Sequence, residues 1–419
     1  MRRLRRRLRW LRRRLRGLRR GLHDGLRQLR GLRPMKVIFI SKYPPMEGYV
    51  SSCTYWLARG LASRGHDVTV VTNAYEVEDA YRELLSPGDL DLYQTKGLRV
   101  RNTDPFQDYR LIPSANPFCE KLASAAIERS EGVDVLDCWY LVSYGAAGML
   151  ARAATGVPLV LRHAGSDIGR LAANPHLRPL ISAMLRKADA VAAQKAARRK
   201  LVELGARAGR VHIIPVSVDT GAFNTDSEPE KLDVPDGVPV ITYMGKVSRG
   251  KGIAELLAAA AKVRQDFRLL LVSSGEGALK DMNIHSGLRR KLLCRRFVPP
   301  WKVPGIIRAS RCVIAPEHRF PVAGHSPILP REVLACGTCL MISKELSRKV
   351  AGAALRADEN AIVIDPPDVA DFAVKLRSVV RDDGLASRIG KEGHRLSRRI
   401  EDFNSYLAAN EKMYRKVCL

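Results

Sequence analysis

Residues 35–50 read MKVIFISKYPPMEGYV. The run of β-branched and apolar residues over Val37–Ser41 predicts a buried strand. Two prolines and Gly48 predict a tight loop after it, and the apolar spacing that follows predicts a helix over Ser51–Arg64. Val68–Thr72 then reads as the next strand. A strand, a helix and a second strand in this order are typical of a parallel sheet covered by helices.

The same alternation continues to the end of the chain in two series. A polar, proline-containing stretch, Asn224–Gly237, lies between the series. We therefore expect an α/β fold with two doubly wound domains, residues 35–216 and residues 217–402. Further strands are expected at Val133–Cys138, Pro158–Arg162, Ala190–Ala193, Val211–Pro215, Val238–Met244, Arg268–Ser273, Phe297–Val298, Cys312–Ala315, Cys339–Ser343 and Ala361–Ile364, with a final helix at Phe403–Val417.

Composition excludes several classes of protein. The 419 residues include 71 Lys and Arg against 43 Asp and Glu, a net charge of +28, and 46% of them are hydrophobic, which excludes global disorder. No apolar run approaches the roughly 18–20 residues of a membrane-spanning helix. Eight cysteines are too sparse for a disulfide scaffold. Because no signal peptide is visible, we expect a cytoplasmic protein with reduced thiols.

Half of the net charge belongs to a basic N-terminal extension, residues 1–34, which holds 15 Arg and one acid, Asp24. Nine leucines from Leu4 to Leu32 are spaced by three or four residues, as on one face of a helix. Such a helix suits an anionic membrane surface, so a peripheral position at the inner face of the membrane is expected. Two alternatives stay open: contacts with nucleic-acid phosphates, without specificity, and a natural start at Met35.

Ligands of parallel sheets bind beyond the carboxyl ends of the strands, next to helix N-termini. Gly48 stands there after the first strand, where a backbone can approach a ligand closely. His163 and Asp167 follow the strand Pro158–Arg162. For all three, an ordinary connecting loop and a functional loop are both open.

The second series opens with residues 243–252, YMGKVSRGKG. Gly245 and Lys251 have P-loop spacing, but Gly252 stands where a P-loop needs Ser or Thr to hold Mg²⁺. An ATPase is therefore disfavoured. Lys246 and Lys251 before a helix instead suit a diphosphate that is bound by charge and by the helix dipole, without a metal.

Further candidates follow later strands of the second series. Ser274 and Gly275 form a tight turn after one strand, and Glu317 and His325 lie after another. Glu332 sits in the first turn of a short helix, where its carboxylate can accept hydrogen bonds from ribose hydroxyls.

Two other motifs are discounted. Cys336 and Cys339 have the C-x-x-C spacing of metal and redox sites, but no second pair completes a zinc site, so packing is the better explanation. Asp89 and Asp91 form a D-x-D pattern, which binds metal in one class of transferases. They lie in a polar connection and not after an apolar strand, so no metal site is expected.

Together these motifs resemble the retaining GT-B glycosyltransferases of family 4, also called group 1. The resemblance covers residues 35–419, and it is the order and spacing of the motifs that make it specific. The motifs are the Gly48 loop, Arg162-His163-Ala164-Gly165-Ser166-Asp167, Ile214–Asp219 with Phe223, Gly245-Lys246 with Lys251-Gly252, and Glu332-Val333-Leu334-Ala335-Cys336-Gly337.

The chain departs from the family pattern at two places. Lys246 replaces the arginine of the phosphate loop, which keeps the charge and loses the bidentate fork. The family has two glutamates separated by seven residues, and Gly324 stands where the one before Glu332 belongs. Glu317 or His325 could reach the same place by another path.

The resemblance implies a GT-B fold in which the final helix, residues 403–419, crosses back to complete the first domain. It implies transfer of a sugar from a nucleotide-diphosphate sugar to a hydroxyl acceptor with retention, and no metal or other cofactor. The acceptor would be a glycan, a lipid-linked sugar or a small molecule. Implied catalytic residues are His163 on the sugar, Lys246 and Lys251 on the diphosphate, and Glu332 on the ribose. Implied donor-binding residues are Gly48, Asp167, Gly245, Ser274, Gly275, Val298, Glu317 and His325.

Two other functions remain open. One is a non-catalytic homologue that binds sugar nucleotides, because Gly324 replaces a glutamate. The other is a nucleotide-sugar epimerase of similar two-domain shape.

Overall fold

The computed structural model describes residues 33–83, 85–104, 118–273, 279, 282, 284–320, 327–350 and 354–419. The expectations for the N-terminal extension before residue 33, and for Ser274, Gly275 and His325, lie outside these residues. In the part of the chain that is described, no helix is both long and apolar enough to cross a bilayer.

The first domain is built on a seven-stranded parallel sheet in the order β3-β2-β1-β4-β5-β6-β7. β1 lies inside this sheet, its residues after Lys36 are buried, and its carboxyl end leads into the Gly48 loop. The strands are β1 (Lys36–Ser41), β2 (Asp67–Thr72), β3 (Leu98–Asn102), β4 (Val135–Trp139), β5 (Leu159–Arg162), β6 (Ala190–Ala193) and β7 (Val211–Ile213).

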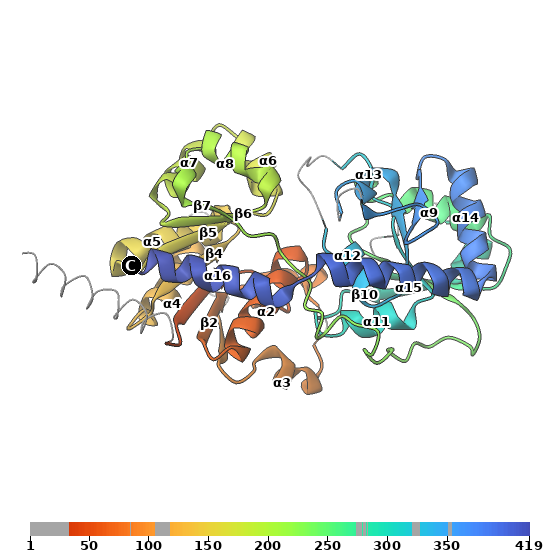
Figure 1. The fold of residues 1–419 in the computed structure, drawn as a ribbon, viewed down its shortest axis with the longest axis horizontal. Coiled ribbons are helices and arrows are strands. Elements are labelled where there is room, and N and C mark those ends of the chain that lie inside the picture. The colour runs from red at the N-terminus through yellow and green to blue at the C-terminus, as the bar shows by residue number, and fades with distance from the viewer. Residues whose placement is uncertain are drawn as a thin grey trace, which may run out of the picture.

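Helices cover both faces of this sheet (Figure 1). α2 (Tyr49–Ser63) begins directly after Gly48, whose φ of 108° is available to glycine at little cost, and buries Tyr55, Leu57 and Leu61. The opposite face packs against the helices after β3, β4 and β5. The other helices of this domain are α3 (Leu90–Tyr93), α4 (Phe118–Glu128), α5 (Ala146–Thr155), α6 (Ser166–Gly169), α7 (Arg178–Lys187) and α8 (Arg198–Glu203).

The second domain repeats the plan with a six-stranded parallel sheet in the order β10-β9-β8-β11-β12-β13. Two parallel, helix-covered sheets confirm the expected α/β fold class with two Rossmann-like domains. The strands are β8 (Val240–Met244), β9 (Arg268–Ser273), β10 (Leu292–Arg296), β11 (Cys312–Ala315), β12 (Cys339–Ser343) and β13 (Ile362–Ile364), and the helices are α9 (Ile253–Ala261), α10 (Ser286–Arg289), α11 (Val303–Ala309), α12 (Leu329–Ala335), α13 (Lys344–Ser347), α14 (Val369–Arg381) and α15 (Asp383–Ile400).

One edge strand was missed in the sequence, and another was predicted at the wrong residues. β3 was not predicted, because Arg99 and Arg101 interrupt its apolar pattern. The strand expected at Phe297–Val298 is β10, which ends at Arg296. Each edge strand pairs with a single neighbour, so its polar side chains can reach solvent and apolar patterning is weak.

The chain crosses between the domains twice, and the two crossings are joined by Glu401. After α15 the chain returns along α16 (Phe403–Val417), so that α15 and α16 extend across both domains (Figure 1). Arg331 of α12 donates to both oxygens of Glu401, at 2.5 and 2.6 Å. Ser217 Oγ and the Val218 N–H of the first crossing also donate to Glu401, at 3.0 and 2.9 Å. The boundary at residue 216 stays a prediction.

We expect Arg331→Ala to lower the free energy of unfolding by about 3–5 kcal/mol, because it leaves the carboxylate of Glu401 buried without its counter-ion. The Glu401 side chain is 0% exposed. The control is Arg356→Ala, which breaks an exposed pair with Glu359 and should cost about 0–1 kcal/mol. Urea denaturation of the three proteins measures both values. Equal small losses would contradict the structural role given to Glu401.

We also expect Gly252→Ala to be destabilising. Gly252 precedes α9 at φ 70°, and a Cβ there would lie 2.2 Å from the backbone oxygen of Pro316. Gly156 is the matched control, with φ 73° and nothing within 4 Å of its Cβ position. Both substitutions carry the cost of placing alanine in a left-handed backbone conformation. Only Gly252→Ala also creates a steric overlap, so it should lower the free energy of unfolding by about 1–3 kcal/mol more than Gly156→Ala does. The same loss in both variants, measured by thermal unfolding, would refute the close approach.

Candidate active site

The loops after β1 and β8 bring the two domains into contact at the carboxyl ends of their sheets. Lys246, after β8, lies 2.6 Å from Glu47, after β1. A second contact lies beside it, where Arg296 at the end of β10 donates to the backbone oxygens of Asp79 and, at 3.0 Å, of Arg82. The sequence places candidate ligand-binding loops at these strand ends, and the structure brings those of both domains together.

The loop from Gly245 to Gly252 is held by the Tyr243 side chain of β8. Tyr243 donates from its hydroxyl to the Lys246 backbone oxygen at 2.8 Å, and a Cβ on Gly245 would lie 3.0 Å from that hydroxyl. Lys251 turns towards β11 and forms an ion pair with the buried Glu317. Both candidate phosphate-binding lysines therefore face a carboxylate in this structure: Glu47 for Lys246 and Glu317 for Lys251.

Three charged residues around Lys246 were missed in the sequence. Glu47 and Glu83 are buried together, and burial raises the pKa of Glu83 well above its usual range, with the charge of Glu47 raising it further. Burial, followed by the charge of Lys246, lowers the pKa of Lys42. Lys42 and Glu47 lie in the same loop as Gly48, between β1 and α2. Their charges could have marked them as candidate site residues, but only Gly48 was singled out from the sequence.

His163 directly follows β5, as expected, and its side chain is partly buried. Burial lowers the pKa of His163 to about 4, so its imidazole is neutral at pH 7. Among the described residues, its Nδ1 atom has no hydrogen-bond partner. The His163 loop continues towards the β1 loop, because Ser166 lies 3.0 Å from the Tyr140 hydroxyl and the Lys42 ammonium lies 5.3 Å from the Tyr140 ring.

Asp167 points into the protein. Its carboxylate accepts hydrogen bonds from the backbone N–H groups of Leu141, Ala164 and Ile168 at 2.8–3.1 Å. Burial raises the pKa of Asp167 to about 7, and the backbone donors oppose that shift. Asp167 therefore orders the loops after β4 and β5, and direct contact with a donor stays a prediction.

Glu332 lies in the first turn of α12, as expected, and faces the junction between the domains. It lines a cavity of about 10 Å³, room for about one water, together with Cys53, Trp56 and Tyr406. The pKa of Glu332 is raised to about 8, chiefly by burial. The charge of Glu401 adds to this rise, and the charge of Arg331 opposes it. Val298 is buried just after β10, in the small core of β8 and β9. Contacts of Glu332 and Val298 with a nucleotide stay predictions.

The discounted Asp89 is part of the domain interface. It accepts hydrogen bonds from Trp301 Nε1 at 2.8 Å and from Lys302 Nζ at 2.7 Å, and both donors lie just before α11. These contacts lower the pKa of Asp89.

Cys336 and Cys339 are buried free thiols, as the packing explanation predicted. Within the described ranges, no three His, Cys, Asp or Glu side chains gather as metal ligands do.

Comparisons with known proteins identify the family. The model of the glycosyl transferase 4-like domain matches residues 50–217, and that of glycosyl transferases group 1 matches residues 224–396. A D-inositol 3-phosphate glycosyltransferase of Xylanimonas cellulosilytica is 27% identical over 373 residues, which are 82% of this chain and 86% of the relative. An alpha-maltose-1-phosphate synthase of Mycolicibacterium smegmatis is 25% identical, over 50% of this chain and 57% of that protein.

Solved structures agree on the fold. A sucrose-phosphate synthase from Thermosynechococcus elongatus superposes with a TM-score of 0.66 at 18% identity, over 91% of this chain and 98% of the other. HepE from Anabaena, in complex with UDP and glucose, superposes with a TM-score of 0.62 at 14% identity, over 90% and 98%. The chain therefore belongs to the group 1, family-4-like glycosyltransferases of the GT-B fold, enzymes that move a sugar from a nucleotide-diphosphate sugar to a hydroxyl acceptor with retention.

Proposed function

We propose that Lys246 and Lys251 bind the diphosphate of the donor and that His163 contacts the transferred sugar. The observation that carries this proposal is the pairing of both lysines with carboxylates in the structure, Lys246 with Glu47 and Lys251 with Glu317. Carboxylates and phosphates attract the same cations, so a diphosphate can replace a carboxylate beside each ammonium group. The lysines are thereby oriented before the donor arrives.

Positive charge at these positions favours the chemical step. As the bond between sugar and diphosphate breaks, negative charge grows on the leaving oxygen, and cations aimed at it lower the barrier. Lys246 and Lys251 supply two charges, and the N-terminus of α9, just after Gly252, adds its dipole. A neutral His163 can hold a sugar hydroxyl without adding a positive charge beside the cationic sugar of the transition state.

The acceptor is proposed to be a sugar or another polyol. Glu47 is released from Lys246 when the diphosphate binds, and it then lies buried next to Glu83 with oxygens that can accept hydrogen bonds from hydroxyl groups. Curated relatives include D-inositol 3-phosphate glycosyltransferases, whose name denotes a polyol acceptor. Glycan, lipid-linked and small-molecule acceptors all fit this description.

The membrane role of residues 1–34 is also a proposal. Its support is the spacing of the nine leucines and the net charge of +14 in that segment. The protein would then be peripheral at the inner face of the membrane.

A panel of nucleotide sugars, assayed for release of the nucleoside diphosphate, tests the function. We expect release with one donor and a further increase when a polyol acceptor is added. Donor binding without any release would instead indicate a non-catalytic homologue, and an isomerised donor sugar would indicate an epimerase.

We expect Lys251→Ala to lower kcat on that donor by about 10²-fold or more, because one electrostatic donor at the leaving group is worth roughly 3–4 kcal/mol. The control is Lys262→Ala, which removes an exposed lysine at the other end of α9 and should leave kcat unchanged. Circular dichroism confirms the fold of each variant. A folded Lys251→Ala protein with normal turnover would remove this loop from the donor site.

We expect removal of residues 1–34 to abolish binding to anionic vesicles and to leave turnover of the donor intact. The binding of the full chain should weaken with salt, because exposed charges are screened within about 8–10 Å at 0.1–0.15 M. Cosedimentation with anionic and neutral vesicles at two salt concentrations measures this. Equal binding to both kinds of vesicle would exclude the electrostatic mechanism.

A further inference from the structure

A buried ion pair joins β4 to β5, the strand that leads to His163. Arg162, the last residue of β5, donates from Nε to both oxygens of Asp137 at 2.8 and 2.9 Å, and from Nη2 to Oδ2 at 2.7 Å. Arg162 is 3% exposed and Asp137 is 0% exposed. Apolar side chains of similar volume often stabilise a core as well as a buried ion pair does, so stability alone is a weak explanation for this one.

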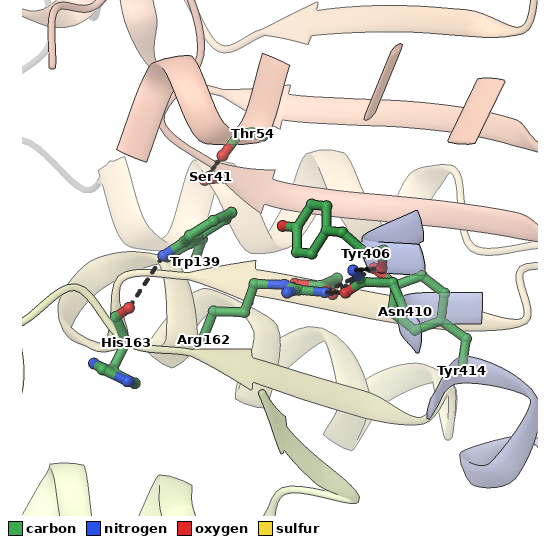
Figure 2. A network of polar contacts seen from close by, with 9 residues as sticks. Ser41, Thr54, Trp139, Arg162, His163, Tyr406, Asn410 and Tyr414 are labelled. Atoms are coloured by element: carbon green, nitrogen blue, oxygen red, sulfur yellow. Dashed lines mark hydrogen bonds and ion pairs between the residues drawn. The ribbon is translucent and has the colours of Figure 1, made fainter. Parts of the chain in front are cut away.

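The C-terminal helix completes this ion pair from the far end of the chain. Asn410 Oδ1 accepts from Arg162 Nη2 at 2.5 Å. The Tyr414 hydroxyl accepts from Arg162 at 3.0 Å and donates to Asp137 Oδ2 at 2.7 Å. Figure 2 shows both side chains of α16 converging on the guanidinium group. Three side chains from two elements, β4 and α16, thus hold Arg162 in one orientation.

Trp139 connects this network to the candidate active site. It is paired with Arg162 in the β4–β5 register, and the guanidinium carbon lies 5.4 Å from its ring centroid. Its Nε1 donates to the backbone oxygen of His163 at 3.2 Å, while the imidazole turns away from the indole (Figure 2). Its ring also contacts Tyr49, the first residue of α2, edge to face at 6.4 Å.

We propose that Trp139 is a positioning residue for His163 and that Asn410 and Tyr414 of α16 act on His163 through Arg162 and Trp139. This inference rests on the proposed catalytic role of His163. The helix that closes the fold thereby also sets the geometry of the loop after β5. Since Trp139 contacts the start of α2 as well, it holds the Gly48 loop and the His163 loop at a defined separation.

The competing explanation is that these side chains only attach α16 to the first domain. A neighbour on the same helix provides the matched control. Glu411 binds Arg64 at 2.6 Å and His66 at 3.0 Å, on the side of α2 and β2, and makes no contact with the Arg162 network. Glu411→Gln should therefore loosen the attachment of α16 without moving His163.

The experiment compares Trp139→Phe, Tyr414→Phe and Glu411→Gln in the full chain. Trp139→Phe keeps an aromatic ring and removes the indole N–H, and Tyr414→Phe removes one hydroxyl. Two readouts are used: kcat for donor turnover, and the imidazole NMR signal of His163 in protein labelled at histidine. That signal is identified by its loss in His163→Gln.

We expect Trp139→Phe and Tyr414→Phe to shift the His163 signal and to lower kcat by about tenfold, with the KM for the donor nearly unchanged, since small misplacements of reacting groups are costly. Glu411→Gln should lower only the thermal midpoint. In a His163→Ala background, Trp139→Phe should cause no further loss of kcat.

A His163 signal at the wild-type position in both aromatic variants would overturn the proposal, as would a full additional loss of kcat in the His163→Ala background. The two hypotheses can fail separately. If His163→Ala keeps normal kcat while Trp139→Phe still shifts the His163 signal, the positioning stands and the catalytic role of His163 is wrong.

Discussion

Glu401 is buried at the point where the chain passes from the second domain back to the first. Arg331 neutralises it from α12, and Ser217 and Val218 bind it from the earlier crossing. A buried carboxylate needs its counter-ion and its hydrogen-bond donors to stay where they are. The two crossings and α12 of the second domain are therefore joined at this carboxylate, which helps to fix how the two domains face each other.

Because loops at the carboxyl ends of the two sheets meet, each domain contributes half of the candidate site. The first domain brings Glu47 and the His163 loop, and the second brings Lys246 and Lys251. The ion pair between Glu47 and Lys246 joins the halves at 2.6 Å. In the proposed donor site, a diphosphate competes with Glu47 for Lys246, so this proposal couples donor binding to the proposed acceptor environment by charge.

Some candidate site residues could be named from the sequence, because ligands of parallel sheets bind beside the loops that follow the strands. Gly48, His163, Lys246 and Lys251 all follow strands in the structure, as expected. The partners of these residues were not visible, because a βα loop does not indicate which distant carboxylate it will meet. Asp89 is an example: it looked like part of a polar connection, and the fold places it against Trp301 and Lys302.

The sequence alone determined the alternation of strands and helices, and with it the two parallel sheets, because local apolar periodicity is set by burial on each element. It could not determine the edge strands β3 and β10, where one side is solvated. The tertiary structure alone decided which charges are neutralised. Arg162 meets Asn410 and Tyr414 about 250 residues later in the chain because α16 crosses back over the first domain. Such contacts depend on the path of the whole chain, and no local pattern encodes them.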